Sequence, residues 1–137
     1  PSNNNEKFLR IRVRHLINEL QRNGLDKKKL NNTIKNLKHS DNVVNHYVRE
    51  NFKKNSFFLI EKKQILLNQE FFNQPYEIIF RCFSDSLKII GKKYYSVRGK
   101  KLDKIIEKIA KNSPFKVTLG GCIIEKVNQT VIISKEY

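Results

Sequence analysis

The apolar residues of this chain change their spacing between its two ends, and that change limits the folds it can adopt. Near the N-terminus they recur every three or four residues, as one face of an α-helix requires: Leu9, Val13, Leu16, Ile17 and Leu20. Near the C-terminus they alternate with other residues, as in a half-buried strand: Phe115, Val117 and Leu119. The sequence therefore predicts an α+β protein.

Local signals divide this pattern into elements. A first helix ends at Asn23-Gly24, and a second is capped by Asp26 and reaches about Phe52. A hairpin is expected in "SFFLIEKKQILLNQ", and a helix follows Pro75 and closes at Gly91. A further helix carries Leu102, Ile105, Ile106 and Ile109, and the chain finishes with strands that turn at Asn128-Gln129.

The polar segment "KKNS" marks a boundary between two parts. We expect an N-terminal helical pair over residues 1–54, followed by a small lobe of two helices and two β-hairpins over residues 55–137. No apolar run is long enough to span a bilayer, and the polar N-terminus does not resemble a signal peptide. The expected location is cytoplasmic.

The pair Gly120-Gly121, followed by Cys122, raises the question of a catalytic loop. A phosphate-binding loop needs a helix after its glycines, whereas "CIIEKV" has a strand pattern, so a bend in a hairpin is favoured. Two cysteines without a CxxC motif are typical of buried free thiols, and the three histidines lack neighbouring ligands for zinc. The sequence predicts neither catalytic nor metal-binding residues.

The formal charge of +15 indicates a polyanionic partner. An A/T-rich genome would also enrich lysine, but would scatter it evenly. Instead, residues 7–29 hold eight basic side chains against Glu19 and Asp26, and residues 88–111 hold nine against Asp103 and Glu107. This clustering favours a binding surface over mutational drift.

Two clusters are candidate RNA contacts. In residues 92–111, cations are interleaved with tyrosines, a mixture that stacks on bases and binds phosphates; an ordinary solvated helix face is the alternative. In the first helix, three arginines at alternate positions suit a phosphate or carboxylate partner. The predicted RNA-binding residues are Arg10, Arg12, Arg14, Lys92, Lys93, Tyr94, Tyr95, Arg98, Lys100, Lys101, Lys104 and Lys108.

Three segments, in order, resemble bacterial tRNA(Ile)-lysidine synthetases. The first looks like the segment leaving their catalytic domain, with P-S-N, F-x-R-x-R-x-R, two leucines and G-L. It is matched by Pro1, Ser2, Asn3, Phe8, Arg10, Arg12, Arg14, Leu16, Leu20, Gly24 and Leu25. "YYSVRGKKLDKII" is similar to a family segment with an aromatic residue and an arginine, matched by Tyr95 and Arg98. "TLGGCIIE" with "IISKE" resembles the family's closing hairpin, although Lys135-Glu136 replaces the usual Arg-Glu.

The resemblance implies a role in forming lysidine. Such enzymes use ATP to adenylate the wobble cytidine of isoleucine tRNA, and the side-chain amine of lysine then displaces AMP. Their S-G-G-x-D-S motif is absent from this sequence, so the resemblance implies a connector and a tRNA-binding lobe downstream of a catalytic domain. ATP, magnesium and lysine would then bind elsewhere in the parent enzyme. The tRNA-binding chain could also form a homodimer, which would double the charged surface offered to a long RNA. Two alternatives stay open: a stand-alone basic RNA- or DNA-binding module, and a protein-interaction domain.

Overall fold

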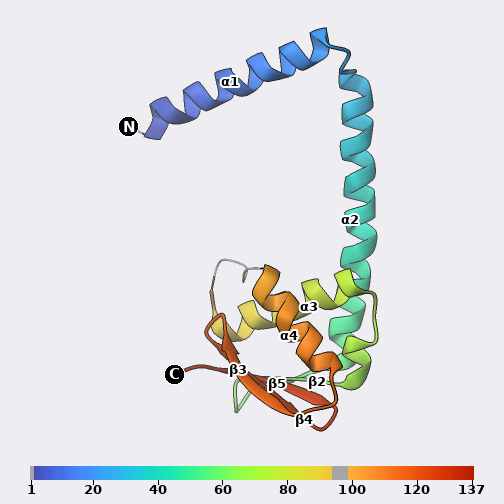
Figure 1. The fold of residues 1–137 in the computed structure, drawn as a ribbon, viewed down its shortest axis with the longest axis vertical. Helices are drawn as coiled ribbons and strands as arrows, with labels where there is room; N and C mark the ends of the chain where they lie inside the picture. The colour runs from blue at the N-terminus through green and yellow to red at the C-terminus, as the bar shows by residue number, and fades with distance from the viewer. Residues whose placement is uncertain (1, 94–98) are drawn as a thin grey trace. The chain divides into compact units, whose positions relative to one another are not determined.

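A computed structural model describes residues 2–93 and 99–137, and its fold is α+β, as the sequence predicts (Figure 1). The elements are, in order, α1 (Ser2–Arg22), α2 (Lys27–Asn55), β1 (Ser56–Leu59), β2 (Gln64–Leu67), the 3₁₀ turn η1 (Gln69–Phe72), α3 (Tyr76–Gly91), α4 (Gly99–Ala110), β3 (Phe115–Leu119), β4 (Cys122–Val127) and β5 (Thr130–Lys135). Contacts between residues divide the chain into two compact units, residues 1–41 and residues 42–137.

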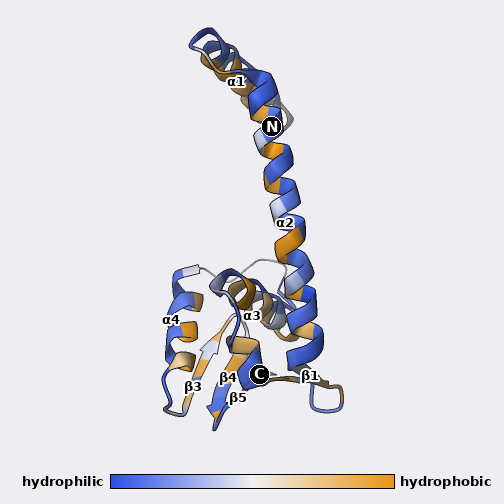
Figure 2. Cartoon of the chain, turned by 90° about the vertical axis from the view of Figure 1, so that its right-hand side faces the viewer, coloured by the Kyte–Doolittle hydropathy of each residue, from blue (hydrophilic) through white to orange (hydrophobic). Residues whose placement is uncertain are grey.

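The first unit consists of α1 and the N-terminal part of α2. Gly24, with φ +104°, forms the turn after α1, and the Asp26 carboxylate accepts a hydrogen bond from the backbone N–H of Lys28 at 2.9 Å. The end of the first helix at Gly24 and the cap of the second helix at Asp26 therefore lie where the sequence predicted them. Most apolar residues of α1 and early α2 are exposed, including Leu9 at 61% and Leu37 at 64%. Figure 2 shows them as orange bands between hydrophilic residues.

The second unit is built on one antiparallel sheet with the strand order β1-β2-β5-β4-β3. The predicted β1–β2 hairpin forms, and where the sequence predicts one further hairpin the structure has the β3–β4–β5 meander, which contains two. Pairing of β2 with β5, which sets Ile65 opposite Ile133, joins the hairpins into a single sheet. Figure 1 shows α3 and α4 together on one face of this sheet.

Strand alternation and helical periodicity meet in the core of this unit. The buried strand residues point to the helix-covered face, and α3 and α4 contribute the apolar residues that their periodicity predicts. The fully buried side chains are mostly large and apolar: Ile65, Leu67, Phe71, Phe83, Leu87, Leu102, Ile124, Val131 and Ile133. The result is a two-layer lobe whose helices have one buried and one solvent-facing side.

The compact units meet inside α2, between Asp41 and Asn42, and the C-terminal part of that helix belongs to the second unit. Val48 is in the core and Phe52 packs against it, so the last turns of α2 share the buried surface of the lobe. The expected boundary at residues 54–55 coincides with the end of α2 at Asn55. As a division into functional domains, it stays a prediction.

Candidate nucleic-acid interface

The exposed side of α4 is lined with lysines. Its opposite side is buried, since Leu102, Ile105, Ile106 and Ile109 all lie in the core. The lysines at positions 100, 101, 104 and 108 are exposed, as is Lys111 just beyond the helix. Because residues three and four apart share a helix face, these side chains form one cationic strip, hereafter the α4 lysine strip (Lys100, Lys101, Lys104, Lys108 and Lys111). The structure thus brings together the predicted contacts of this helix.

One edge of the strip is held to α3. The Tyr76 hydroxyl donates a hydrogen bond to the carboxylate of Asp103, which joins the first turn of α3 to α4. The Tyr76 ring also contacts Phe80, with ring centroids 6.2 Å apart. These contacts, together with the buried apolar face, fix the rotation of α4 about its axis and so the direction in which the strip faces.

The end of α3 carries two more predicted contacts. Lys92 adopts the left-handed conformation with φ +52° and its N–H bonds to the Lys88 carbonyl at 2.9 Å, so Lys92 closes the helix. Lys93 is exposed and extends over the β3–β4 turn, where a Cβ added to Gly121 would lie 3.1 Å from its Cε. The predicted contacts Tyr94, Tyr95 and Arg98 lie outside the described residues.

The three arginines of α1 are exposed but do not form one cluster. Arg10 and Arg14, four residues apart, share a face of the helix. Arg12, two residues from each, lies on the opposite side. Helix geometry therefore separates Arg12 from the other two arginines. Their role as RNA contacts stays a prediction.

The glycine pair is a hairpin turn, as the strand pattern predicted. Leu119 pairs with Cys122, and Gly120 and Gly121 between them have φ of +63° and +77°, the positive values that a two-residue type I′ turn needs. A strand follows the pair, so its N–H groups do not open a helix N-terminus toward a phosphate.

Both cysteines are buried free thiols. Burial raises the pKa of each thiol from 9.0 to about 11. A hydrogen bond partly opposes this rise in each case: the Asn51 side chain lowers the pKa of Cys82, and the Gly91 backbone lowers the pKa of Cys122. At neutral pH both groups are protonated, which disfavours nucleophilic attack. In the described part of the chain, no group of three or more His, Cys, Asp and Glu side chains could hold a metal ion, and no helix is long and apolar enough to cross a membrane.

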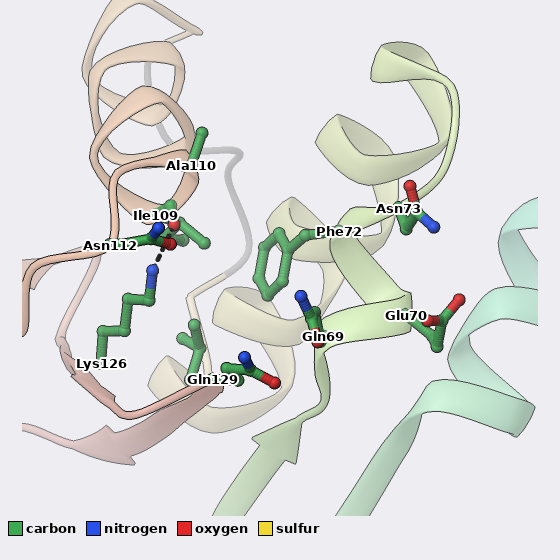
Figure 3. A pocket seen from close by; sticks show the side chains of 10 residues that line it. Gln69, Glu70, Phe72, Asn73, Ile109, Ala110, Asn112, Lys126 and Gln129 are labelled. Atoms are coloured by element: carbon green, nitrogen blue, oxygen red, sulfur yellow. Dashed lines mark hydrogen bonds between the residues drawn. The ribbon is translucent and has the colours of Figure 1, made fainter.

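A polar cavity of about 310 Å³ opens where α4 ends. It lies between η1, the segment after α4 and the β4–β5 corner, and Figure 3 shows its side chains. The lining residues are Gln69, Glu70, Phe72, Asn73, Ile109, Ala110, Asn112, Lys126, Gln129 and Val131.

Lys126 forms one wall of this cavity and lies on the buried face of β4. Its side chain is only 8% exposed, and its ammonium donates hydrogen bonds to the Ile109 and Lys111 carbonyls, both at 2.6 Å. These bonds satisfy carbonyls that the end of α4 leaves without helical partners. The sequence analysis did not predict this cavity. The sequence pattern that could have indicated it is the alternation of Cys122, Ile124 and Lys126, which places a lysine on the apolar face of β4.

Two curated relatives resemble almost the whole chain. One is the tRNA(Ile)-lysidine synthase of Wolbachia sp. subsp. Brugia malayi (strain TRS), 27% identical over 140 residues, and the other is the tRNA(Ile)-lysidine synthase of Wolbachia pipientis wMel, 28% identical over 140 residues. Each alignment covers 98% of this chain and 32% of the relative, so the chain spans about a third of their length. No family model and no solved structure matches the chain.

Proposed function

We propose that this chain is the tRNA-binding part of an ATP-dependent ligase that attaches lysine to the wobble cytidine of isoleucine tRNA. The α4 lysine strip is the observation that carries the RNA-binding role, because its lysines are exposed on one side of a helix whose opposite side is buried in the core. The specific reaction is supported by the names of the two relatives and by the order of the matching sequence segments. The enzyme would act in the cytoplasm of a bacterium.

In this proposal, ATP, magnesium and lysine bind a catalytic domain outside this chain. The Gly120-Gly121 turn supports that division, since it connects two strands and does not form a phosphate loop. The role left to this chain is to hold the tRNA, with the α4 lysine strip contacting phosphates. Arg10, Arg12 and Arg14 would act near the catalytic domain.

A protein-interaction role is a second candidate, and the exposed apolar residues of α1 favour it. Phe8 is 71% exposed and Leu20 is 54% exposed. Such a helix face can pack on a second copy of the chain or on another protein. Self-association measured by analytical ultracentrifugation in high salt, without any RNA binding, would support this candidate over the first.

The main test compares tRNA affinity and its salt dependence between matched variants. The first variant replaces Lys101, Lys104 and Lys108 by Gln. The control replaces Lys38, Lys53 and Lys62, which are exposed outside the strip, and loses the same charge. We expect the strip variant to bind at least about tenfold more weakly, and its plot of log affinity against log salt to be less steep by about 0.7–0.9 per lost phosphate contact.

Equal losses in both variants would show that only net charge matters and would contradict a specific interface. Absence of binding at low salt, or binding that does not respond to salt, would contradict RNA recognition by this surface. Competition with a different tRNA addresses specificity, because a general basic module would bind both species equally. The comparison is made with the chain alone and again with a lysidine-forming catalytic domain restored.

A further inference from the structure

We propose that the polar cavity beside the end of α4 binds an unpaired nucleobase. The inference rests on the proposed RNA-binding function and goes beyond it, because it adds a base-binding site to a surface that otherwise contacts phosphates. The cavity lies wholly within the second compact unit, and its volume of about 310 Å³ is at the lower end of the ~300–1,000 Å³ typical of small-ligand pockets. That size suits a single planar ring system better than a larger ligand.

Phe72 supplies an aromatic surface on one wall of the cavity. Its ring packs edge-on against Phe71 and Phe83, with centroid distances of 4.9 Å and 6.0 Å. These contacts hold the ring in place, while the residue is only half-buried and borders the cavity in Figure 3. A ring fixed in this way can stack on a base without further loss of conformational freedom.

Side-chain amides supply the polar contacts. Gln69 and Gln129 come from η1 and the β4–β5 corner and extend into the space between these elements in Figure 3. Asn112 lies beside the Lys126 ammonium on the α4 side. Each amide carries a donor and an acceptor, so together they match the mixed donor and acceptor edge of an unpaired base.

The charges of the lining favour a neutral ligand over a bare phosphate or a metal ion. Among the described residues that line the cavity, Lys126 is the one cation, and two of its three ammonium N–H groups already bond to backbone carbonyls. Among the same residues, Glu70 is the one carboxylate, and its side chain points away from Lys126 in Figure 3. One lysine N–H is left to bond a carbonyl oxygen, such as those of a base.

The α4 lysine strip leads to this cavity. Lys104, Lys108 and Lys111 follow the helix toward the end where Ile109 and Asn112 line the cavity. At 1.5 Å per residue, these lysines extend over about 10 Å. The strip and the cavity therefore share the C-terminal end of α4, so a strand whose phosphates follow the strip would pass this end of the helix, an arrangement in which cations follow the backbone and aromatic residues stack on bases.

The test uses variants that alter base contacts without changing charge. Gln69→Ala with Gln129→Ala removes two exposed amides, and Phe72→Leu removes the stacking surface. Gln64→Ala, on the sheet face away from the helices, is the control. We expect about tenfold weaker tRNA binding for the cavity variants, no change for the control, and an unchanged salt dependence, because no phosphate contact is lost.

A direct measurement separates failure of this inference from failure of the proposed function. Cytidine, uridine, adenosine and guanosine are added separately at millimolar concentration to ¹⁵N-labelled protein, and the side-chain amide signals of Gln69, Asn112 and Gln129 are followed by NMR. Shifts in these signals, lost in Phe72→Leu, support the cavity even if tRNA binding fails. Normal tRNA binding by the folded Gln69→Ala/Gln129→Ala variant, without nucleoside shifts, would overturn the inference and leave the α4 lysine strip in place.

Discussion

Gly91, the last residue of α3, lies so close to the β3–β4 turn that a larger side chain does not fit. A Cβ at this position would lie 2.4 Å from the Gly120 carbonyl oxygen and 3.2 Å from the Cys122 sulfur. The contact with a backbone oxygen is the severe one, because the turn would have to move. We expect Gly91→Ala to lower the free energy of unfolding by about 1–3 kcal/mol, as overpacking does, measured by urea denaturation.

Gly99→Ala is the matched control. Gly99 also lies at a helix end, but among the described residues its added Cβ would meet only the Phe80 ring, at 3.8 Å, an ordinary contact. Its effect should be neutral or stabilising by up to about 1 kcal/mol, because alanine favours the helix. Equal effects of the two substitutions would mean that α3 and the turn are not in close contact.

These residues also show what local sequence patterns can reveal. Gly91 is correctly predicted at the end of α3, but Lys92 is the residue that adopts a positive φ, and Gly91 is needed because the β3–β4 turn packs closely against it. The Gly120-Gly121 turn follows from two flanking strand patterns. The inward side chain of Lys126 could be read from alternation alone, but its carbonyl partners on Ile109 and Lys111 depend on how α4 packs on the sheet.

At the scale of elements, asparagines join the end of α2 to the β2–η1 corner. The buried Asn51 donates a hydrogen bond to the Phe71 carbonyl at 3.2 Å and accepts one from Asn55 at 2.8 Å. Asn68 caps η1 by accepting from the Phe71 N–H at 3.0 Å. We expect Asn51→Ala to reduce the unfolding free energy by about 1–3 kcal/mol, because the Phe71 carbonyl loses a partner in the core.

Thermal unfolding followed by circular dichroism checks this prediction. Asn36→Ala is the control, since Asn36 lies on the same helix but is exposed in the first unit. Alanine there should change stability by less than about 0.5 kcal/mol. If Asn51→Ala were equally mild, the asparagine contacts would contribute little to the attachment of α2.

The elements themselves were largely predictable, whereas their assembly was not. The apolar faces of α3 and α4 and the β4–β5 pair follow from periodicity, and the lysines of α4 are exposed because they lie opposite Leu102 and Ile106. The pairing of β2 with β5 joins segments far apart in the chain, and no local pattern specifies it. The cavity depends on three such segments, so it could not be predicted before the sheet order was known.

At the scale of the whole molecule, we expect residues 42–137 to fold without residues 1–41. Every residue of the buried core cluster lies in this part, from Val48 onward. The first unit contributes helices whose apolar residues are exposed, such as Leu16 at 51% and Ile34 at 45%. Helical stability in proteins comes mainly from such residues being buried, so little is lost when this unit is removed. Fragment 42–137 should melt within a few degrees of the full chain by calorimetry.

A shorter fragment, residues 56–137, tests where the folding unit begins. It lacks the last turns of α2 and therefore loses the buried contacts of Val48, Asn51 and Phe52. Removing two apolar groups and the hydrogen-bond donor to the Phe71 carbonyl costs several kcal/mol, a large part of the stability of a domain this size. We expect fragment 56–137 to be largely unfolded at 37 °C. If both fragments were equally stable, the folding boundary would lie at the end of α2, and the last turns of that helix would belong to the connector.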